Sequence, residues 1–278
     1  MRTFATPGPI LATVVVAGAR VRVTASDRTE TVVLVEPIDK ASPSDIRVAD
    51  KTRVDFAGGQ LSVKTTASGD RNGSVAITID LPAGSGLVSY LAHSEVTADG
   101  SFGECELHMA SGQVRLDRIG ALQANIGAGA VAIGRLAGRA TIEGAAFAMR
   151  IGEVEDTVKL SSSGGQVWIG HAAGDLDLSS GSGRFDIDRA DGGVAARTGD
   201  GAIRIGRLTR GQAELVNHSG DIEVGISEGA VARVDADSKR GAVRDSVRSQ
   251  DNPGPSDTTL TVHARSRHGD ITIHRAAG

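Results

Sequence analysis

Apolar residues recur through the middle of the chain at intervals of eighteen residues. Every eighteenth position from Val131 is apolar, and a second apolar series begins two residues later at Ile133. The two series are Val131, Met149, Val167, Phe185, Ile203 and Ile133, Ile151, Ile169, Ile187, Ile205. A fixed period of this length is typical of repeat proteins, in which each repeat is a structural unit that stacks on its neighbours. The repeat therefore predicts the fold of the protein, and it says little about an activity.

Within each repeat, alternating apolar and polar positions predict two short strands. Val167 and Ile169 face inward around an outward Trp168, and residues 176–178 show the same alternation. A glycine precedes the first strand in most repeats, where a corner needs a positive φ or a close backbone approach. Phe147 replaces this glycine in one repeat and predicts a different turn there. The glycines are Gly129, Gly165, Gly183 and Gly201.

Two architectures fit this pattern, a parallel β-helix and an antiparallel meander. In a parallel β-helix, equivalent positions of successive turns stack on one another. The corner positions Leu136 and Val154 also repeat at eighteen residues, as inward-facing corners of a β-helix would. We therefore predict an all-β fold, a parallel β-helix or β-solenoid with rungs of about eighteen residues.

The repeat does not extend over the whole chain. Residues 1–85 are predicted to form an irregular N-terminal β cap continuous with the array, because the open end of a repeat stack needs covering. Residues 86–278 are predicted to be the β-solenoid repeat region, with one residue lost before Val131 and one gained before Ile222. Residues 238–258 are polar, contain an Asn-Pro-Gly-Pro sequence and predict a mobile loop.

Strand signals also fill the predicted cap. Two alternating strands are expected over residues 10–35, followed by a connecting loop at 36–52 with a short helical turn at 43–45. Further strands are expected at residues 53–56, 61–64 and 74–81, the last two joined by a hairpin turn at 71–73.

Composition and charge narrow the class of protein. Aromatic residues make up only 3% of the chain, so a core of Val, Ile, Leu and Ala is expected, which suits a narrow stacked interior. The net charge of -4 gives no electrostatic reason to expect a nucleic acid or an acidic membrane as partner. Residues 10–19 resemble a signal peptide, but only Arg2 precedes them as a charge and they merge into alternating strand sequence. We expect a first strand there, no membrane-spanning helix and a cytoplasmic protein, with export by another route left open.

Few residues suggest metal, cofactor or thiol chemistry. Cys105 is the only cysteine and lies in an alternating run, so a buried core thiol is favoured over a reactive one. The histidines follow no recognised zinc-ligand spacing, and the loop around Asp200 lacks the full pattern of calcium-binding β-rolls. No metal site and no cofactor are predicted.

The outward positions of the first strand form a column of polar and aromatic side chains. Asp186, Arg204 and Glu223 alternate in sign on successive repeats, so they are predicted to pair. Asp186 and Asp188 flank an inward residue at a spacing compatible with paired carboxylates, but Asp188 stands where a turn residue is expected. No catalytic residue is therefore predicted. The candidate ligand wall on this surface is Trp168, Asp186, Arg204 and Arg150.

Residues 198–206 (TGDGAIRIG) and 267–273 (RHGDITI) resemble a bacterial β-strand-repeat family of unknown function whose members are named adhesins by analogy. The opening residues 4–10 (FATPGPI) and 25–33 (ASDRTETVV) resemble its actinobacterial branch. The resemblance implies a β-helix-like fold and brings no catalytic residues. We expect a non-enzymatic scaffold or protein-interaction protein, adhesin-like by resemblance. A carbohydrate-binding or carbohydrate-acting β-helix is the alternative, and self-association through the terminal rungs is a third hypothesis.

Overall fold

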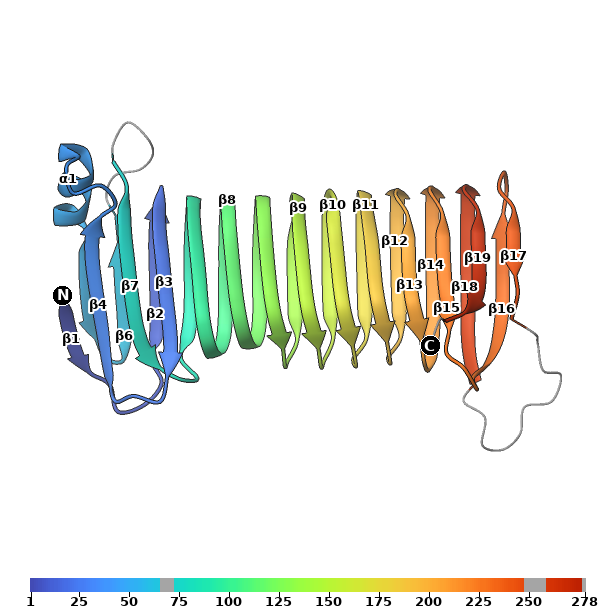
Figure 1. Cartoon of the computed structure of the whole chain (residues 1–278), viewed down its shortest axis with the longest axis horizontal. Coiled ribbons are helices and arrows are strands. Elements are labelled where there is room, and N and C mark those ends of the chain that lie inside the picture. Colours follow the sequence, from blue (N-terminus) through green and yellow to red (C-terminus); the bar gives the residue numbers. More distant parts are fainter. Residues whose placement is uncertain (66–72, 248–258, 277–278) are drawn as a thin grey trace. The chain divides into compact units, whose positions relative to one another are not determined.

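The computed structural model describes residues 1–65, 73–247 and 259–276. In these residues the chain forms nineteen strands and one helix, and most strand pairs are parallel (Figure 1). The predicted all-β fold with mainly parallel pairing is therefore confirmed. The chain divides into two compact units, residues 1–137 and residues 138–278. The repeat region predicted at 86–278 begins inside the first unit.

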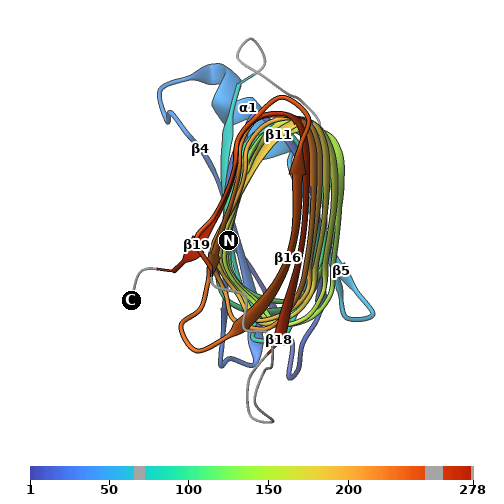
Figure 2. The same ribbon diagram turned by 90° about the vertical axis from the view of Figure 1, so that its right-hand side faces the viewer.

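The second unit begins with three long strands that stack in parallel register, β9 (Ala140–Val154), β10 (Val158–Ala172) and β11 (Leu176–Ala190). Val167 pairs with Phe185, an offset of eighteen residues, so the turns stack as the repeat predicts and the antiparallel alternative is wrong here. Seen along the stacking direction, successive turns of this unit follow nearly the same path (Figure 2).

Each of these strands contains both predicted short strands of the repeat, joined across the corner where β10 and β11 carry glycine. In β9 the buried Phe147 occupies this corner and keeps the register with Gly165. The next two turns are split into separate strands, β12 (Val194–Asp200) with β13 (Ile203–Leu208), and β14 (Gly211–Ser219) with β15 (Ile222–Ile226). Their partners are nineteen residues apart, as for Ile203 and Ile222, so the predicted insertion of one residue is confirmed.

The C-terminal segment is inserted between two earlier turns. β18 (Thr259–His268) pairs with β14 on one side and with β16 (Val231–Ser238) on the other. β19 (Ile271–Arg275) lies in the same way between β15 and β17 (Val243–Asp245). The sequential order of rungs expected from the repeat is therefore wrong at this end.

Burial explains this order of strands. β18 buries Leu260, Val262 and Ala264 completely, as a strand with neighbours on both sides should. The residues of β17 are all exposed, and β16 carries Asp235 and Asp237, charges that suit an edge strand. β17 also lies within the loop predicted at 238–258, whose residues 248–258 fall outside the described residues.

In the first unit, β8 (Gly86–Leu136) winds through successive turns. His93 and Ser111 are hydrogen-bonded eighteen residues apart, whereas the amide of Gly100 donates to Asp117 seventeen residues on. The predicted loss of one residue is thus present, and it falls between these two contacts.

Earlier strands of the first unit add both parallel and antiparallel pairs. β2 (Leu11–Ala17) lies between β8 and β6 (Gln60–Lys64), and β3 (Ala19–Ser26) lies between β8 and β7 (Val75–Pro82), all in parallel. The antiparallel strands are β1 (Arg2–Ala5), β4 (Glu30–Pro37) and β5 (Arg53–Ala57). β6 pairs with β5 and β2 while β7 pairs with β4 and β3, so the expected β6–β7 hairpin is wrong. Of its turn residues, 71 and 72 lie outside the described residues.

The loop expected at 36–52 contains a full helix, α1 (Pro43–Lys51). Ser42 caps its first turn and proline follows directly, a combination that favours a helix start. Asp45 accepts hydrogen bonds from the amides of Asp39 and Ser74, at 2.9 Å and 3.0 Å. These bonds, led by that from Asp39, lower the pKa of Asp45 and fasten the helix to the neighbouring chain.

The interior of both units is built from the predicted apolar columns. The corner positions from Leu136 to Leu208 are buried, and Cys105 is a buried thiol whose pKa burial raises to about 12, as expected of a core cysteine. Val14 and Val16 of β2 are also buried, so residues 11–17 form a strand as predicted, although β1 precedes it. The expectation of two strands over residues 10–35 is wrong, because Gly18, with a φ of 62°, separates β2 from β3 and β4 follows as a third strand. Among the described residues, the single helix is too short to cross a bilayer.

Candidate functional site

The four residues of the predicted ligand wall lie together on one outer face of the second unit. The register places Arg150 beside Trp168, Trp168 beside Asp186, and Asp186 beside Arg204. Glu223 follows on β15. The sequence column is therefore a spatial column, with one residue from each of five adjacent turns.

Trp168 is engaged by its own chain. The guanidinium carbon of Arg150 lies 4.2 Å from the centroid of the indole ring, a cation–π contact. The ring is only partly exposed and also lies against Gly170, where an added Cβ would come within 3.0 Å of it. This indole is therefore not an open platform on which a ligand ring could stack.

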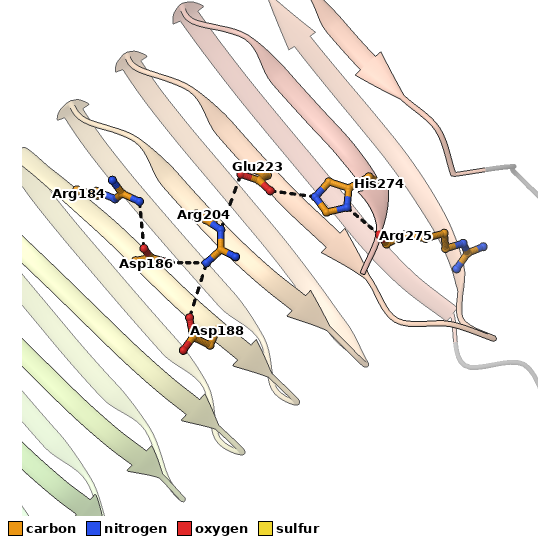
Figure 3. Close-up of polar contacts among 7 residues, drawn as sticks. All are labelled: Arg184, Asp186, Asp188, Arg204, Glu223, His274 and Arg275. Atoms are coloured by element: carbon orange, nitrogen blue, oxygen red, sulfur yellow. Dashed lines mark hydrogen bonds and ion pairs between the residues drawn. The ribbon is translucent and has the colours of Figure 1, made fainter. Parts of the chain in front are cut away.

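Arg204 joins the acidic residues of the column (Figure 3). Its guanidinium donates to Asp186 at 2.9 Å and lies 3.7 Å from Asp188 and 3.8 Å from Glu223. The hydrogen bond with Asp186, then the charges of all three carboxylates, raise the pKa of Arg204. The predicted pairing of alternating charges is confirmed. Asp186 and Asp188 share the guanidinium of Arg204, so both carboxylates take part in the contact between adjacent turns.

His274 extends this network onto the C-terminal segment. Its Nε2 lies 3.0 Å from Glu223, and its Nδ1 lies 2.8 Å from the carbonyl oxygen of Arg275 (Figure 3). The eighteen-residue period does not predict this contact, because Glu223 and His274 are 51 residues apart in the sequence.

A second polar cluster, the Asp191 cluster, lies at the turn that follows β11. Asp191 accepts hydrogen bonds from Arg189 at 2.8 Å and from Thr209 at 2.7 Å, and bonds with His171 at 2.9 Å. Its partial burial alone would raise the pKa of Asp191, but these three hydrogen bonds outweigh burial and hold the pKa well below its usual value. The sequence does contain a signal, because His171 and Arg189 are register neighbours eighteen residues apart.

Asp191→Asn is expected to lower the free energy of unfolding by about 1–3 kcal/mol at pH 7. A carboxylate with a depressed pKa stabilises the fold above its unfolded pKa, and this contribution is lost as the pH falls through the folded value. The gap between wild type and variant should therefore narrow below about pH 4. Urea unfolding at pH 7 and pH 3 measures it, with the exposed Asp177→Asn as control. A gap equal at both pH values would contradict this role.

The described residues contain no group of three His, Cys, Asp or Glu side chains placed to hold a metal ion. The three C-terminal histidines have separate partners. His263 lies 3.4 Å from Asp235, His274 bonds with Glu223, and His268 packs against His218.

A shallow groove of about 610 Å³ crosses the turns of the first unit. Tyr90 and His108, on adjacent turns of β8, stack almost parallel with ring centroids 4.6 Å apart, and His108 bonds with Glu106 at 2.6 Å. These rings stand beside a strip of small residues in the groove lining, Ala17, Ala92, Ala110 and Gly127. This site was not predicted from the sequence, although Tyr90 and His108 are eighteen residues apart.

Comparison with solved structures finds matches over nearly the full chain. One is described as a "putative adhesin" from Parabacteroides merdae ATCC 43184, with 11% identity and a TM-score of 0.39, covering 99% of this chain and 95% of that one. A "putative lipid binding protein" from Parabacteroides distasonis ATCC 8503 has 10% identity and a TM-score of 0.36, covering 99% and 96%. A "putative adhesin" from the same organism has 9% identity and a TM-score of 0.33, covering 98% and 95%.

No curated protein matches the chain. The family model described as Toastrack DUF4097 matches residues 11–278. The chain therefore belongs to the Toastrack DUF4097 family.

Proposed function

We propose that this chain is a non-enzymatic β-solenoid scaffold that binds a protein partner through its outer faces. The observation that carries the proposal is the Arg204 network. Its carboxylates, the best catalytic candidates in the sequence, are used to join adjacent turns. Asp191 is used in the same way. These polar groups stabilise a regular surface, and such surfaces are what repeat proteins present to their partners.

A different protein is the proposed partner, in preference to a second copy of this chain. Within the second unit, the edge strand β16 carries Arg233, Asp235 and Asp237, all exposed. Charged side chains on an edge strand oppose pairing with an identical edge. The charges therefore favour binding of a different protein to an outer face over pairing of two copies of this chain through β16.

Affinity capture from the native host, with the tagged chain as bait and mass spectrometry as readout, tests this proposal. One stoichiometric protein partner is expected. A variant with Arg150→Glu and Arg204→Glu should lose a partner that binds the Trp168 column, whereas Arg22→Glu in the first unit should retain it. Absence of any partner for the folded chain counts against the proposal. A substrate-dependent activity abolished by Asp186→Asn or Asp188→Asn would refute it.

Carbohydrate binding is the second candidate, and the Tyr90–His108 groove favours it. An exposed aromatic pair beside a floor of small side chains offers a shallow surface with hydrogen-bonding edges, suited to a sugar ring. The Trp168 wall is less suitable because Arg150 covers that indole. On a glycan array, Tyr90→Ala should abolish binding while Trp168→Ala retains it. If Trp168→Ala abolishes binding and Tyr90→Ala does not, the glycan site lies at the Trp168 wall. Absence of glycan binding by the wild type would exclude this candidate.

A further inference from the structure

A second groove, of about 520 Å³, crosses the turns of the other unit, and we call it the serine–arginine groove. It runs over β10, β11, β12, β14 and β18, beside the buried polar side chains of Thr198 and Asn217. Its lining includes Ser161, Ser179, Gly181, Arg197, His218 and Arg267. Neither the ion-pair network around Arg204 nor the Asp191 cluster uses these residues.

The groove is hollow because two adjacent turns carry glycine at the same register. A Cβ on Gly181 would lie 2.8 Å from the carbonyl oxygen of Ser163, and one on Gly199 would overlap the carbonyl oxygen of Gly181. The stacked backbone therefore requires glycine at these positions. The hydroxyl-bearing Ser161 and Ser179 lie on neighbouring turns at the border of this hollow.

One wall of the groove is cationic. Arg197, His218 and Arg267 line it, and His218 packs against His268 with ring centroids 5.4 Å apart. Burial, followed by the charges of Arg240, His218 and Arg267, lowers the pKa of His268. Arg197, His218 and Arg267 therefore form one basic cluster along the groove, with His268 packed against His218.

Few carboxylates balance this cluster. Glu214 is already bound by Arg197 at 2.7 Å. Asp200 is separated from His268 by one turn of the stack, because Ser219 lies between them in the register. Arg240 and Arg267 form no ion pair with any described residue, and both are exposed. In a chain with a net charge of -4, this is a local excess of positive charge.

We propose that the serine–arginine groove binds an oxyanion, namely a phosphate or sulfate monoester group. Guanidinium groups bind such anions with paired, charge-assisted hydrogen bonds, and the hydroxyl of Ser161 supplies a further donor. The glycine floor lets a ligand approach the backbone closely. The volume is that of a small-molecule site, so the anion would be carried by a sugar-sized molecule or a lipid headgroup. This site goes beyond the proposed protein-binding role and does not depend on it.

Calorimetric titration of the full chain tests the proposal with inorganic phosphate, glucose 6-phosphate and glucose as probes. Glucose 6-phosphate is expected to bind and glucose is not. Arg267→Gln and Arg197→Gln replace the two arginines of the groove. Each should weaken binding by about fivefold, the contribution of one cation near an anionic group, and the double variant should weaken it further. Arg22→Gln, an exposed arginine of the first unit, should leave it unchanged. Because the replaced side chains are exposed, thermal melting should show all variants folded.

Vesicles of phosphatidylcholine with and without phosphatidic acid distinguish the two sources of the anion. Binding of glucose 6-phosphate that the double variant loses supports a soluble phosphate ester. If wild type binds vesicles with phosphatidic acid but does not bind glucose 6-phosphate, and the double variant loses this vesicle binding, the result supports a lipid phosphate. The proposal is overturned if wild type binds none of these probes, or if the double variant binds as tightly as wild type.

Discussion

Phe185→Ala is expected to lower the free energy of unfolding by about 3–5 kcal/mol, among the largest losses for a single side chain in this protein. Phe185 is completely buried in β11, and its register neighbours are Val167 and Ile203 on the adjacent turns. Truncation removes the apolar contacts of a whole ring and leaves a cavity. Strands fixed by hydrogen bonds on both sides cannot collapse to fill it.

Urea unfolding followed by tryptophan fluorescence measures this loss. The only tryptophan, Trp168, lies on the adjacent turn beside Asp186, so the probe reports on the same region. Phe185→Leu is the matched control and should cost about 1 kcal/mol, because most of the volume is retained. Equal losses for Ala and Leu would show that the ring itself, and not its volume, is what the core requires.

The sequence predicted much of the second unit because parallel stacking turns a sequence offset into a spatial contact. Phe185 lies over Val167, and Arg204 lies between Asp186 and Glu223, because neighbours in the stack are eighteen or nineteen residues apart. Residues that are eighteen or nineteen apart in the sequence therefore lie side by side on adjacent turns. The Thr209–Asp191 and Tyr90–His108 pairs, each eighteen residues apart, follow the same rule.

The order of strands at the chain ends was not predictable in this way. An alternating apolar strand fits between any two parallel neighbours, so alternation does not say which turns flank β18 or β19. The helix α1 was predicted too short for a different reason. Its start signal at Ser42 is local. The helix is attached to the sheet by a hydrogen bond from the amide of Ser74 to Asp45, and no local sequence pattern predicts this contact.

The two units use the same device at their outer turns. In the first, the early strands β2 and β3 lie between β8 and the later turn formed by β6 and β7. In the second, the late strands β18 and β19 lie between the turn of β14 and β15 and the turn of β16 and β17. In both units, the outermost parallel turn therefore pairs with strands that come from another part of the sequence.

Gly201→Ala is expected to be almost as damaging, at roughly 3 kcal/mol, although it adds only a methyl group. Gly201 has a φ of 145°, which residues with a side chain rarely adopt. Its Cβ would overlap the carbonyl oxygen of Gly183 on the preceding turn. The amide of Gly201 also donates to Ser219 on the following turn at 2.8 Å, so the backbone has no room to move in either direction.

Gly229→Ala separates the two costs. Gly229 also has a positive φ, of 75°, but an added Cβ there meets no atom within 4 Å. This control should lose only the backbone preference, about 1 kcal/mol. The difference between the two variants in urea unfolding then measures the overlap between stacked turns. If both variants lose the same amount, close stacking at the glycine corner contributes nothing.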